Sequence, residues 1–452
     1  MTPRPVPAVQ TKYRRICTKL PVPESLALLE RLAKAEPRAM LGQPPIVWER
    51  AEGVNVYDAW GNVWLDWSSG VLITNAGHGP KEIADAVREV LDRPLLATYV
   101  FAHTLRAELA EMLQSLAPKK AHYRVFLLST GSEAVESAIK LARTYAVAKG
   151  GKRKHVIVGF EGAFHGRTLG AQLAGGLPHL QEWIVKTDAG FVHTPFPDGF
   201  RNEDLAFDQF LRTLSDHGLD GADVAGVITE SYQGIGPNFL PNAYAEELEA
   251  WCKDNDAVLI ADEVQSGFGR TGRMFTYEHY GIEPDLICCG KGISSSLPIS
   301  AVIGRADIMD LYPPGSMTST HSASPVPVAA ALANIRLMRE KGLVERAAAL
   351  DAPLRDGLEA VRRNHPERIG AVMGRGLVAG LLLVKPGTKE PHSEAAAAIN
   401  EKCFEKGLLM FAPVGLGGGC VKIAPPLTTP RDALEEGIDV LRQACDETLE
   451  KA

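Results

Sequence analysis

The chain has 452 residues and a mass of 48.7 kDa, which allows roughly two to three domains whose core needs no disulfide or structural metal. Its net charge of −7 repels phosphate backbones and anionic lipid, so neither nucleic acid nor a membrane is the expected partner. A hydrophobic share of 45% and a charged share of 23% exclude the disordered, collagenous and coiled-coil classes.

Cysteine usage and the N-terminal residues indicate a cytoplasmic protein. The seven cysteines form no Cys-x-x-Cys pair and are odd in number, which predicts neither a disulfide framework nor a zinc site, and we expect no metal ion. No stretch reaches the ~18 apolar residues of a membrane helix, and no apolar signal segment follows Met1. Residues 1–20 are basic, but Pro3, Pro5 and Pro7 break an amphipathic targeting helix, so we expect a loose arm.

The first predicted element is a β-hairpin. Residues 52–58 alternate apolar and polar side chains, and a turn follows at Trp60-Gly61-Asn62. Because this hairpin precedes a parallel sheet that it cannot easily join, we expect residues 1–75, arm and hairpin together, to pack with a smaller C-terminal domain.

Residues 76–328 predict a large α/β domain. Short β-branched runs alternate with helical stretches such as 134–148 and 243–253, which is typical of a mostly parallel sheet with helices on both faces. The predicted strands are 125–128, 155–160, 224–229, 257–261, 286–289 and 299–303.

Residues 329–452 predict a small α+β domain. An alanine-rich stretch that starts at residue 326 reads as two helices joined near Lys341-Gly342, and a final helix starts near Arg431. Apolar runs at 376–384 and 408–411 and a glycine-rich turn at 415–419 lie between them.

A strand that ends in acids and a lysine between glycines are the first signs of chemistry. The apolar run 258–261 delivers Asp262 and Glu263 at its C-terminal end, where ligands of open α/β sheets bind. Lys291 follows the next strand, and its neighbours Gly290 and Gly292 leave it room to reach the same crevice. The alternative is a surface ion pair between neighbouring loops.

The segment 129–134 predicts a phosphate site. It follows a strand and opens a helix, so that Gly131 and Ser132 offer backbone N–H groups and a hydroxyl at the positive end of the helix. The alternative is an ordinary N-cap, supplied by Thr130 or Ser132.

These motifs together resemble one enzyme family. LIADEVQSGFGRTGRM around Asp262, CGKG around Lys291, STGSEAVESAIKLAR from Ser129 and AFHGRT from Ala163 are similar to the class III, pyridoxal-phosphate-dependent aminotransferases of fold type I. That family includes the 4-aminobutyrate, acetylornithine and other ω-amino acid aminotransferases, and the likeness runs from about Trp48 to the C-terminus. It implies an enzyme that moves an amino group from an ω-amino acid or amine to a 2-oxo acid.

The resemblance also implies roles for individual residues. Lys291 would form a Schiff base with pyridoxal 5'-phosphate and then move the substrate proton, while Asp262 would keep a proton on the pyridine nitrogen so that the ring can take up electrons. Arg167 and Glu230 would pair near a substrate carboxylate, with a purely structural ion pair as the alternative. A homodimer, or a dimer of such dimers, would share the active site. The further residues in contact with the cofactor would be Gly131, Ser132, Phe164, Val264, Gln265 and, from the neighbouring subunit, Thr320.

Three departures from the family pattern bear on the substrate. Ile235 stands where the 4-aminobutyrate enzymes carry the last glutamate of EPVQGE, and Lys422 stands where they carry the arginine that pairs with it. Lysine cannot bind a carboxylate in the bidentate way, so the usual route for 2-oxoglutarate is not expected, and the acceptor can equally be pyruvate or another small oxo acid. His321 replaces part of a glycine-rich pattern beside Thr320, where a packing or capping role is the alternative to a role in the site.

Two other functions compete with an aminotransferase. A racemase or 2-epimerase on the same scaffold returns the proton to the opposite face of Cα, and the N-terminal pattern from Val47 resembles such racemases as well. A binding protein that has lost activity is opposed by the retention of both Lys291 and Asp262. Loss of optical rotation of a single amino acid, without an oxo acid, would favour the racemase.

Overall fold

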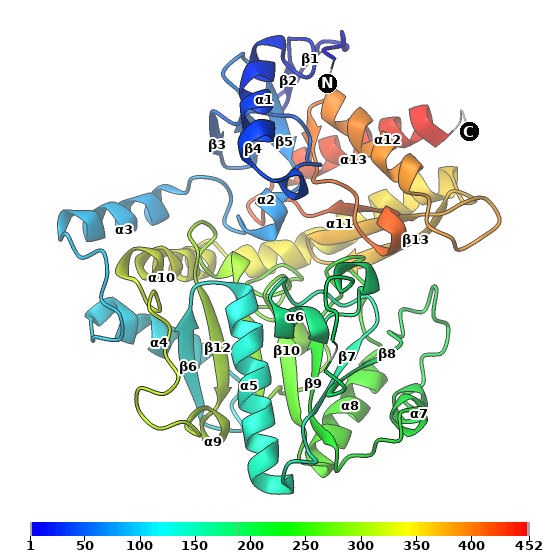
Figure 1. Ribbon diagram of the computed structural model, residues 1–452. Helices are drawn as coiled ribbons and strands as arrows, with labels where there is room; N and C mark the ends of the chain where they lie inside the picture. The colour runs from blue at the N-terminus through cyan, green and yellow to red at the C-terminus, as the bar shows by residue number, and fades with distance from the viewer. Residues whose placement is uncertain (1, 187, 450–452) are drawn as a thin grey trace. The chain divides into compact units, whose positions relative to one another are not determined.

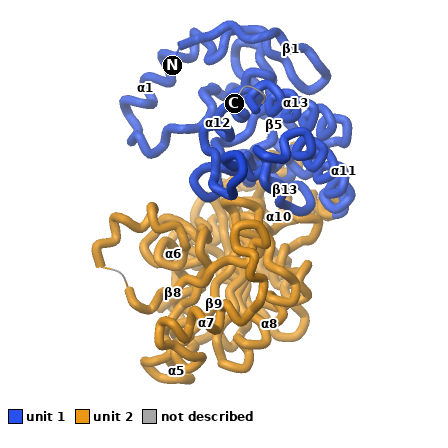
Figure 2. The backbone as a smooth tube through the Cα atoms, turned by 90° about the vertical axis from the view of Figure 1, so that its right-hand side faces the viewer, with its two compact units in different colours: residues 1–80, 345–452 blue, residues 81–344 orange. Residues whose placement is uncertain are grey.

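The computed structural model describes residues 2–186 and 188–449, which form two compact units. One unit is Lys81–Val344, and the other combines Met1–Pro80 with Glu345–Ala452, so the chain leaves this second unit and later returns to it (Figure 2). Each unit has its own cluster of buried apolar side chains.

The unit of residues 81–344 is built on a seven-stranded sheet. Its strand order is β6-β12-β11-β10-β9-β7-β8, and every neighbouring pair is parallel except the two that include β12. The predicted mostly parallel sheet is therefore confirmed. The strands are β6 (Tyr123–Leu128), β7 (Val156–Phe160), β8 (Phe191–Thr194), β9 (Val224–Glu230), β10 (Val258–Asp262), β11 (Leu286–Cys289) and β12 (Ser300–Arg305).

Helices cover this sheet, as Figure 1 shows most clearly for α5, which crosses the face nearest the viewer. Alanines at 134, 138 and 142 are completely buried there and let α5 approach the strands closely. The helices of the unit are α3 (Lys81–Asp92), α4 (Thr104–Leu116), α5 (Gly131–Gly150), α6 (Leu169–Ala174), α7 (Asp208–Asp216), α8 (Asn242–Asp254), α9 (Ala306–Met309) and α10 (Pro325–Glu340).

The register of the parallel strands brings distant parts of the sequence to one edge of the sheet. Asp262, the last residue of β10, lies beside Glu230 at the end of β9 and beside Cys288 near the end of β11. The residues that follow β11, and those that follow β6 and β7, leave the sheet at the same edge because these strands run in the same direction. This edge is where an open α/β sheet binds its ligands.

The other unit contains two smaller sheets. One has the order β1-β2-β5-β4-β3, with β15 parallel to β5, so that the N-terminal hairpin and the segment after α12 share a sheet. The second is an antiparallel sheet in the order β13-β14-β16. The strands of the two sheets together are β1 (Val9–Gln10), β2 (Arg15–Ile16), β3 (Arg50–Glu52), β4 (Asn55–Tyr57), β5 (Val63–Asp66), β13 (Ile369–Arg375), β14 (Val378–Leu383), β15 (Leu408–Leu409) and β16 (Cys420–Ile423).

The two helices expected around Lys341-Gly342 are α10 and α11, and the expected final helix is α13. Only α11 and α13 lie mainly in this unit, because α10 belongs to the unit of residues 81–344 and not to the C-terminal unit in which the sequence placed it. Of the helices in the described part of the chain, none is both long enough and apolar enough to cross a membrane. The remaining elements are α1 (Leu26–Ala35), the short turn α2 (Ser69–Leu72), α11 (Leu343–Asn364), α12 (Ser393–Glu405) and α13 (Arg431–Leu449).

Candidate active site

A cavity of about 170 Å³ lies at the edge of the large sheet where β9, β10 and β11 end. Nearly all of the predicted site residues meet in it although they come from segments far apart in the sequence. Its lining consists of Thr130, Gly131, Ser132, Phe164, His165, Gly166, Glu230, Asp262, Val264, Gln265 and Lys291.

Lys291 is half-buried in the wall of this cavity. It begins a short turn directly after Gly290, and its backbone φ of +40° lies in the left-handed region that side chains rarely adopt. Strain of this kind concentrates at functional sites. Burial lowers the pKa of the Lys291 amine, although the negative charges of Asp262 and Glu230 oppose the shift. A larger fraction of the amine is therefore neutral, the form that attacks a carbonyl or takes up a proton.

Asp262 is buried, and the protein holds both of its carboxylate oxygens. Oδ1 accepts the backbone N–H of Val264 at 3.0 Å, and Oδ2 lies 2.7 Å from Nδ1 of His165. The adjacent Glu263 turns away, since its oxygens accept hydrogen bonds from Ser266 and from the backbone of η4 (Thr276–His279). Only one member of the acid pair faces the cavity.

The N-terminus of α5 forms another wall. Thr130 caps the helix by accepting the N–H of Glu133, whose carboxylate accepts the N–H of Thr130 in return. Among the described residues no group accepts a hydrogen bond from the N–H groups of Gly131 and Ser132, so both remain available to an anion. A Cβ on Gly131 would come within 2.7 Å of Val264, which explains why glycine stands there.

The N-cap of α5 and the predicted phosphate site, given above as alternatives, can therefore both exist. Thr130 is the N-cap, while Ser132 lines the cavity. Gly166 borders the same corner, and any Cβ at that position would lie 2.3 Å from the Ser132 hydroxyl. The close approach of two chain segments around a free hydroxyl leaves a corner suited to phosphate oxygens.

The predicted ion pair between Arg167 and Glu230 does not form in the structure. Glu230 is buried, and its two oxygens accept the N–H groups of Phe164 at 2.9 Å and of Gly234 at 2.8 Å. Arg167 is exposed, with its guanidinium 5.7 Å from the centre of the Phe164 ring. The carboxylate of Glu230 is therefore paired with two backbone N–H groups and not, as the sequence predicted, with the guanidinium of Arg167.

Burial raises the pKa of Glu230 to about 7 from an ordinary 4.5, and the charge of Asp262 adds to the shift. Between these two pH values the folded protein keeps a proton that the unfolded chain releases. We therefore expect the free energy of unfolding of the wild type, relative to Glu230→Gln, to fall by up to about 3 kcal/mol from pH 4.5 to 7 and to stay flat above. Urea unfolding of both proteins at stepped pH measures it, and a difference independent of pH would contradict it.

The lining of the cavity differs from the prediction at two further residues, Thr320 and His165. Thr320 lies in an exposed loop and does not line the cavity, and its predicted contact belongs to a neighbouring subunit. His165 was not among the predicted residues although it stands inside the AFHGRT motif. Its partner Asp262 is 97 residues away, so only the fold could bring them together.

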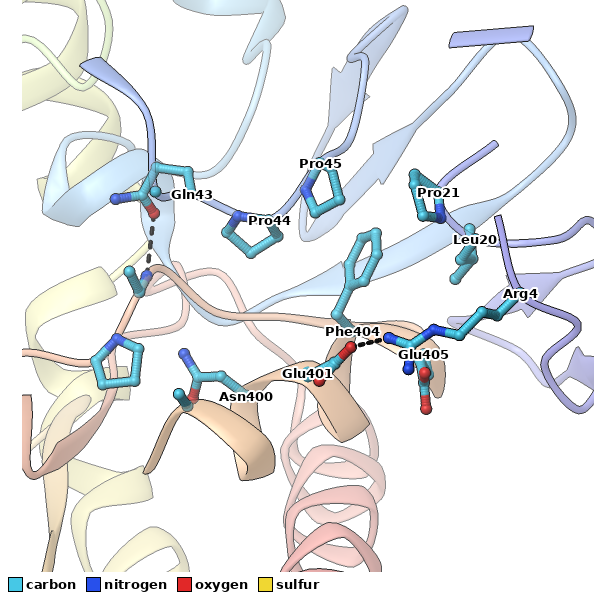
Figure 3. A pocket seen from close by; sticks show the side chains of 14 residues that line it. Arg4, Leu20, Pro21, Gln43, Pro44, Pro45, Asn400, Glu401, Phe404 and Glu405 are labelled. Carbon is cyan, nitrogen blue, oxygen red and sulfur yellow. Dashed lines mark hydrogen bonds and ion pairs between the residues drawn. The ribbon is translucent and has the colours of Figure 1, made fainter. Parts of the chain in front are cut away.

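A larger cavity of about 270 Å³ lies in the other unit (Figure 3). Pro21, Pro44, Pro45 and the ring of Phe404 line it, and its arginine, Arg4, forms an ion pair with Glu401. The described residues that line it include neither a lysine, nor a helix N-terminus, nor a fully buried acid. The smaller cavity, in contrast, combines Lys291, the buried Asp262 and the N-terminus of α5.

The family profile described as aminotransferase class-III matches residues 38–445. The chain belongs to the class III aminotransferase family. Its similarity to the 4-aminobutyrate aminotransferase of Mycobacterium leprae (strain TN) is 35% identity over 443 residues, 95% of this chain and 97% of the relative. A leucine/methionine racemase of Thermococcus litoralis is 32% identical over 429 residues, covering 92% of this chain and 94% of the racemase. The crystal structure of a Bacillus anthracis aminotransferase superposes with a TM-score of 0.85 at 28% identity, covering 94% of this chain and 99% of that one.

Class III aminotransferases use pyridoxal phosphate, and the residues of this cavity fit that group. The cavity offers an amine for the aldehyde, a buried carboxylate for the pyridine nitrogen and unpaired N–H groups of α5 for the phosphate. Glycines at 131 and 166 keep clear the corner that a side chain would fill. The predicted fold type, family and cofactor are thereby confirmed.

Proposed function

We propose that this class III aminotransferase moves an amino group from an ω-amino acid or amine, such as 4-aminobutyrate, to a 2-oxo acid. The observation that carries the proposal is the meeting of the Lys291 amine and the Asp262 carboxylate in one cavity beside the free end of α5. The Mycobacterium leprae relative, named for 4-aminobutyrate, supports the choice of donor.

Each side chain has a chemical task in this proposal. Bound pyridoxal phosphate supplies a protonated ring that withdraws electrons from the substrate Cα. Lys291 holds the cofactor and then carries a proton to and from Cα, for which its lowered pKa suits it. Asp262 keeps the ring nitrogen protonated, and Gly131 and Ser132 bind the phosphate. Phe164, Val264 and Gln265 line the same cavity and would contact the ring.

Arg167 is the group that we assign to a substrate carboxylate. Its guanidinium is exposed beside Phe164, and among the described residues no acid forms an ion pair with it. The planar guanidinium can therefore donate two parallel hydrogen bonds to a carboxylate. In this proposal Glu230 does not contact the substrate. It acts indirectly, because its carboxylate accepts the N–H of Phe164 and so fixes the backbone there.

The donor and the acceptor are tested separately by single-turnover absorbance of the cofactor-loaded protein. We expect 4-aminobutyrate alone to convert the bound aldehyde to its amine form, and an oxo acid to reverse the change. Pyruvate and 2-oxoglutarate are compared as acceptors, because Ile235 and Lys422 depart from the family pattern. Racemisation of leucine or methionine without any oxo acid would instead support the racemase function of the Thermococcus litoralis relative.

We also propose that two copies of the chain assemble into a homodimer that shares its active sites. The segment 91–101 exposes six large apolar side chains, with Leu96 60% and Phe101 75% accessible. The Tyr99 hydroxyl lies 3.1 Å from that of Thr318, which ties this segment to the loop that carries Thr320. A second copy that covers the apolar segment would thus also meet that loop.

The dimer is tested with Phe101→Glu, measured by light scattering on a size-exclusion column. We expect the variant to shift from dimer towards monomer and to lose activity in parallel, because a buried unpaired charge is costly. Val185→Glu is the control, since Val185 is 99% exposed and lies outside the segment. A monomeric wild type would contradict the proposal.

Six of the seven free cysteines are buried as thiols, and we propose a cytoplasmic location, where thiols stay reduced. Within that compartment the enzyme would act on small-molecule amino donors and oxo acids. Neither nucleic acid nor a membrane has a place in this proposal.

A further inference from the structure

His165 is a buried side chain that the proposed function does not yet use. Its ring lies on the cavity wall, and its side chain has no exposed surface. Nδ1 lies 2.7 Å from Oδ2 of Asp262. Nε2 is also buried, and none of the residues in 2–186 and 188–449 forms a hydrogen bond with it. The ring therefore acts through one nitrogen only.

The geometry of Asp262 fixes where the imidazole proton sits. An ionised carboxylate only accepts hydrogen bonds, so the Nδ1 of His165 must be the donor. The second oxygen of Asp262 accepts the N–H of Val264 at 3.0 Å. Each carboxylate oxygen thus receives one donor from the protein, and the rotation of the carboxylate is restricted from two sides.

The charge of the ring follows from the unpaired Nε2. Burial works to lower the pKa of His165, but the hydrogen bond and charge of Asp262, with a smaller effect of Glu230, raise it on balance. A doubly protonated ring would leave a charged N–H at Nε2 without an acceptor, which is costly in a buried site. A cationic pyridine ring at Asp262 would supply the positive charge that this carboxylate attracts and would leave His165 neutral.

We propose that His165 is a positioning residue whose neutral imidazole donates from Nδ1 to Asp262 and thereby holds this carboxylate in the orientation that keeps the cofactor ring protonated. The inference rests on the proposed function. It concerns the supporting residue rather than the groups that contact the reacting atoms.

Three substitutions separate the position of the donor from the bulk of the side chain. In His165→Asn the amide nitrogen lies near the place of Nδ1 and can still donate to Asp262. In His165→Gln the donor lies near the place of Nε2, where the structure offers no acceptor. His165→Leu fills the space without any donor.

The readout is the dissociation constant of pyridoxal phosphate, measured by titrating cofactor-free protein, together with the pH midpoint of the bound cofactor's absorbance. We expect His165→Leu and His165→Gln to weaken binding roughly 10- to 100-fold, the effect of one lost hydrogen bond to a charged group. The pH midpoint should move by about one unit or more. His165→Asn should restore most of the affinity and the midpoint.

The matched control is His365→Leu in the other unit. His365 is also buried and paired with an acid, since its Nε2 lies 2.8 Å from Asp446. We expect it to lower thermal stability without changing either cofactor readout. The positioning role would be overturned if all His165 variants kept the wild-type affinity and midpoint. It would also be overturned if His165→Asn, His165→Gln and His365→Leu all lost the same affinity. In either case, binding of pyridoxal phosphate by the wild type would leave the proposed function intact. A wild type that binds no pyridoxal phosphate would overturn both.

Discussion

Replacing Lys291 by alanine is expected to lower kcat on the order of 10⁴-fold. One side chain both holds the cofactor and carries the proton, so that a single substitution removes two contributions to catalysis. The neutral fraction of this amine, favoured by its lowered pKa, is lost at the same time. Steady-state rates with 4-aminobutyrate and an oxo acid, at saturating pyridoxal phosphate, measure the effect.

Lys140→Ala is the control for Lys291→Ala. Lys140 is an exposed lysine on α5 in the same unit, and it does not line the cavity. We expect this variant to retain the wild-type rate. Full turnover by Lys291→Ala would mean that another amine does the work, and the role of Lys291 would have to be abandoned.

Replacing Asp262 by asparagine is expected to lower kcat by roughly 10³-fold, the scale at which fixed electrostatic groups act on a transition state. The amide is neutral and cannot hold a cationic ring, and its NH₂ group would oppose a donor from His165 or Val264. The pH midpoint of the bound cofactor's absorbance should fall in the same variant. Single-turnover rates with the donor alone isolate the chemical step.

The neighbouring acid provides the matched control. Glu263 is completely buried, but its oxygens bind Ser266 and the backbone N–H groups of Thr276 and Tyr277. We expect Glu263→Gln to lower the melting temperature, because a donor replaces an acceptor among buried donors, while the single-turnover rate stays close to that of the wild type. Equal loss of rate in both variants would contradict the assignment of Asp262 alone to the cofactor.

Much of the large sheet could be predicted because its strands are short, buried runs with little ambiguity. Val258–Asp262 and Leu286–Cys289 are buried throughout, which is why their sequences are continuously apolar. β8 (Phe191–Thr194) was missed, since its four residues alternate between half-buried and buried and include a histidine. The antiparallel direction of β12 was also not predictable, because strand direction depends on pairing and not on composition.

The site was predictable where the motif itself carries the chemistry. Asp262 and Lys291 stand at strand ends that parallel pairing must bring to one edge. The partner of Glu230 was not predictable in this way, because backbone N–H groups of Phe164 and Gly234 leave no trace in side-chain patterns. The contact between His165 and Asp262 likewise depends on how two loops fold back over the sheet.

The central claim is that one pyridoxal phosphate lies between the amine of residue 291 and the carboxylate of residue 262. A crystal structure of the protein grown with pyridoxal phosphate tests it most directly. The predicted result is continuous electron density from Nζ of Lys291 to the ring, the ring nitrogen within hydrogen-bond distance of Asp262, and the phosphate at Gly131 and Ser132. Cofactor density elsewhere, or joined to a different lysine, would contradict it.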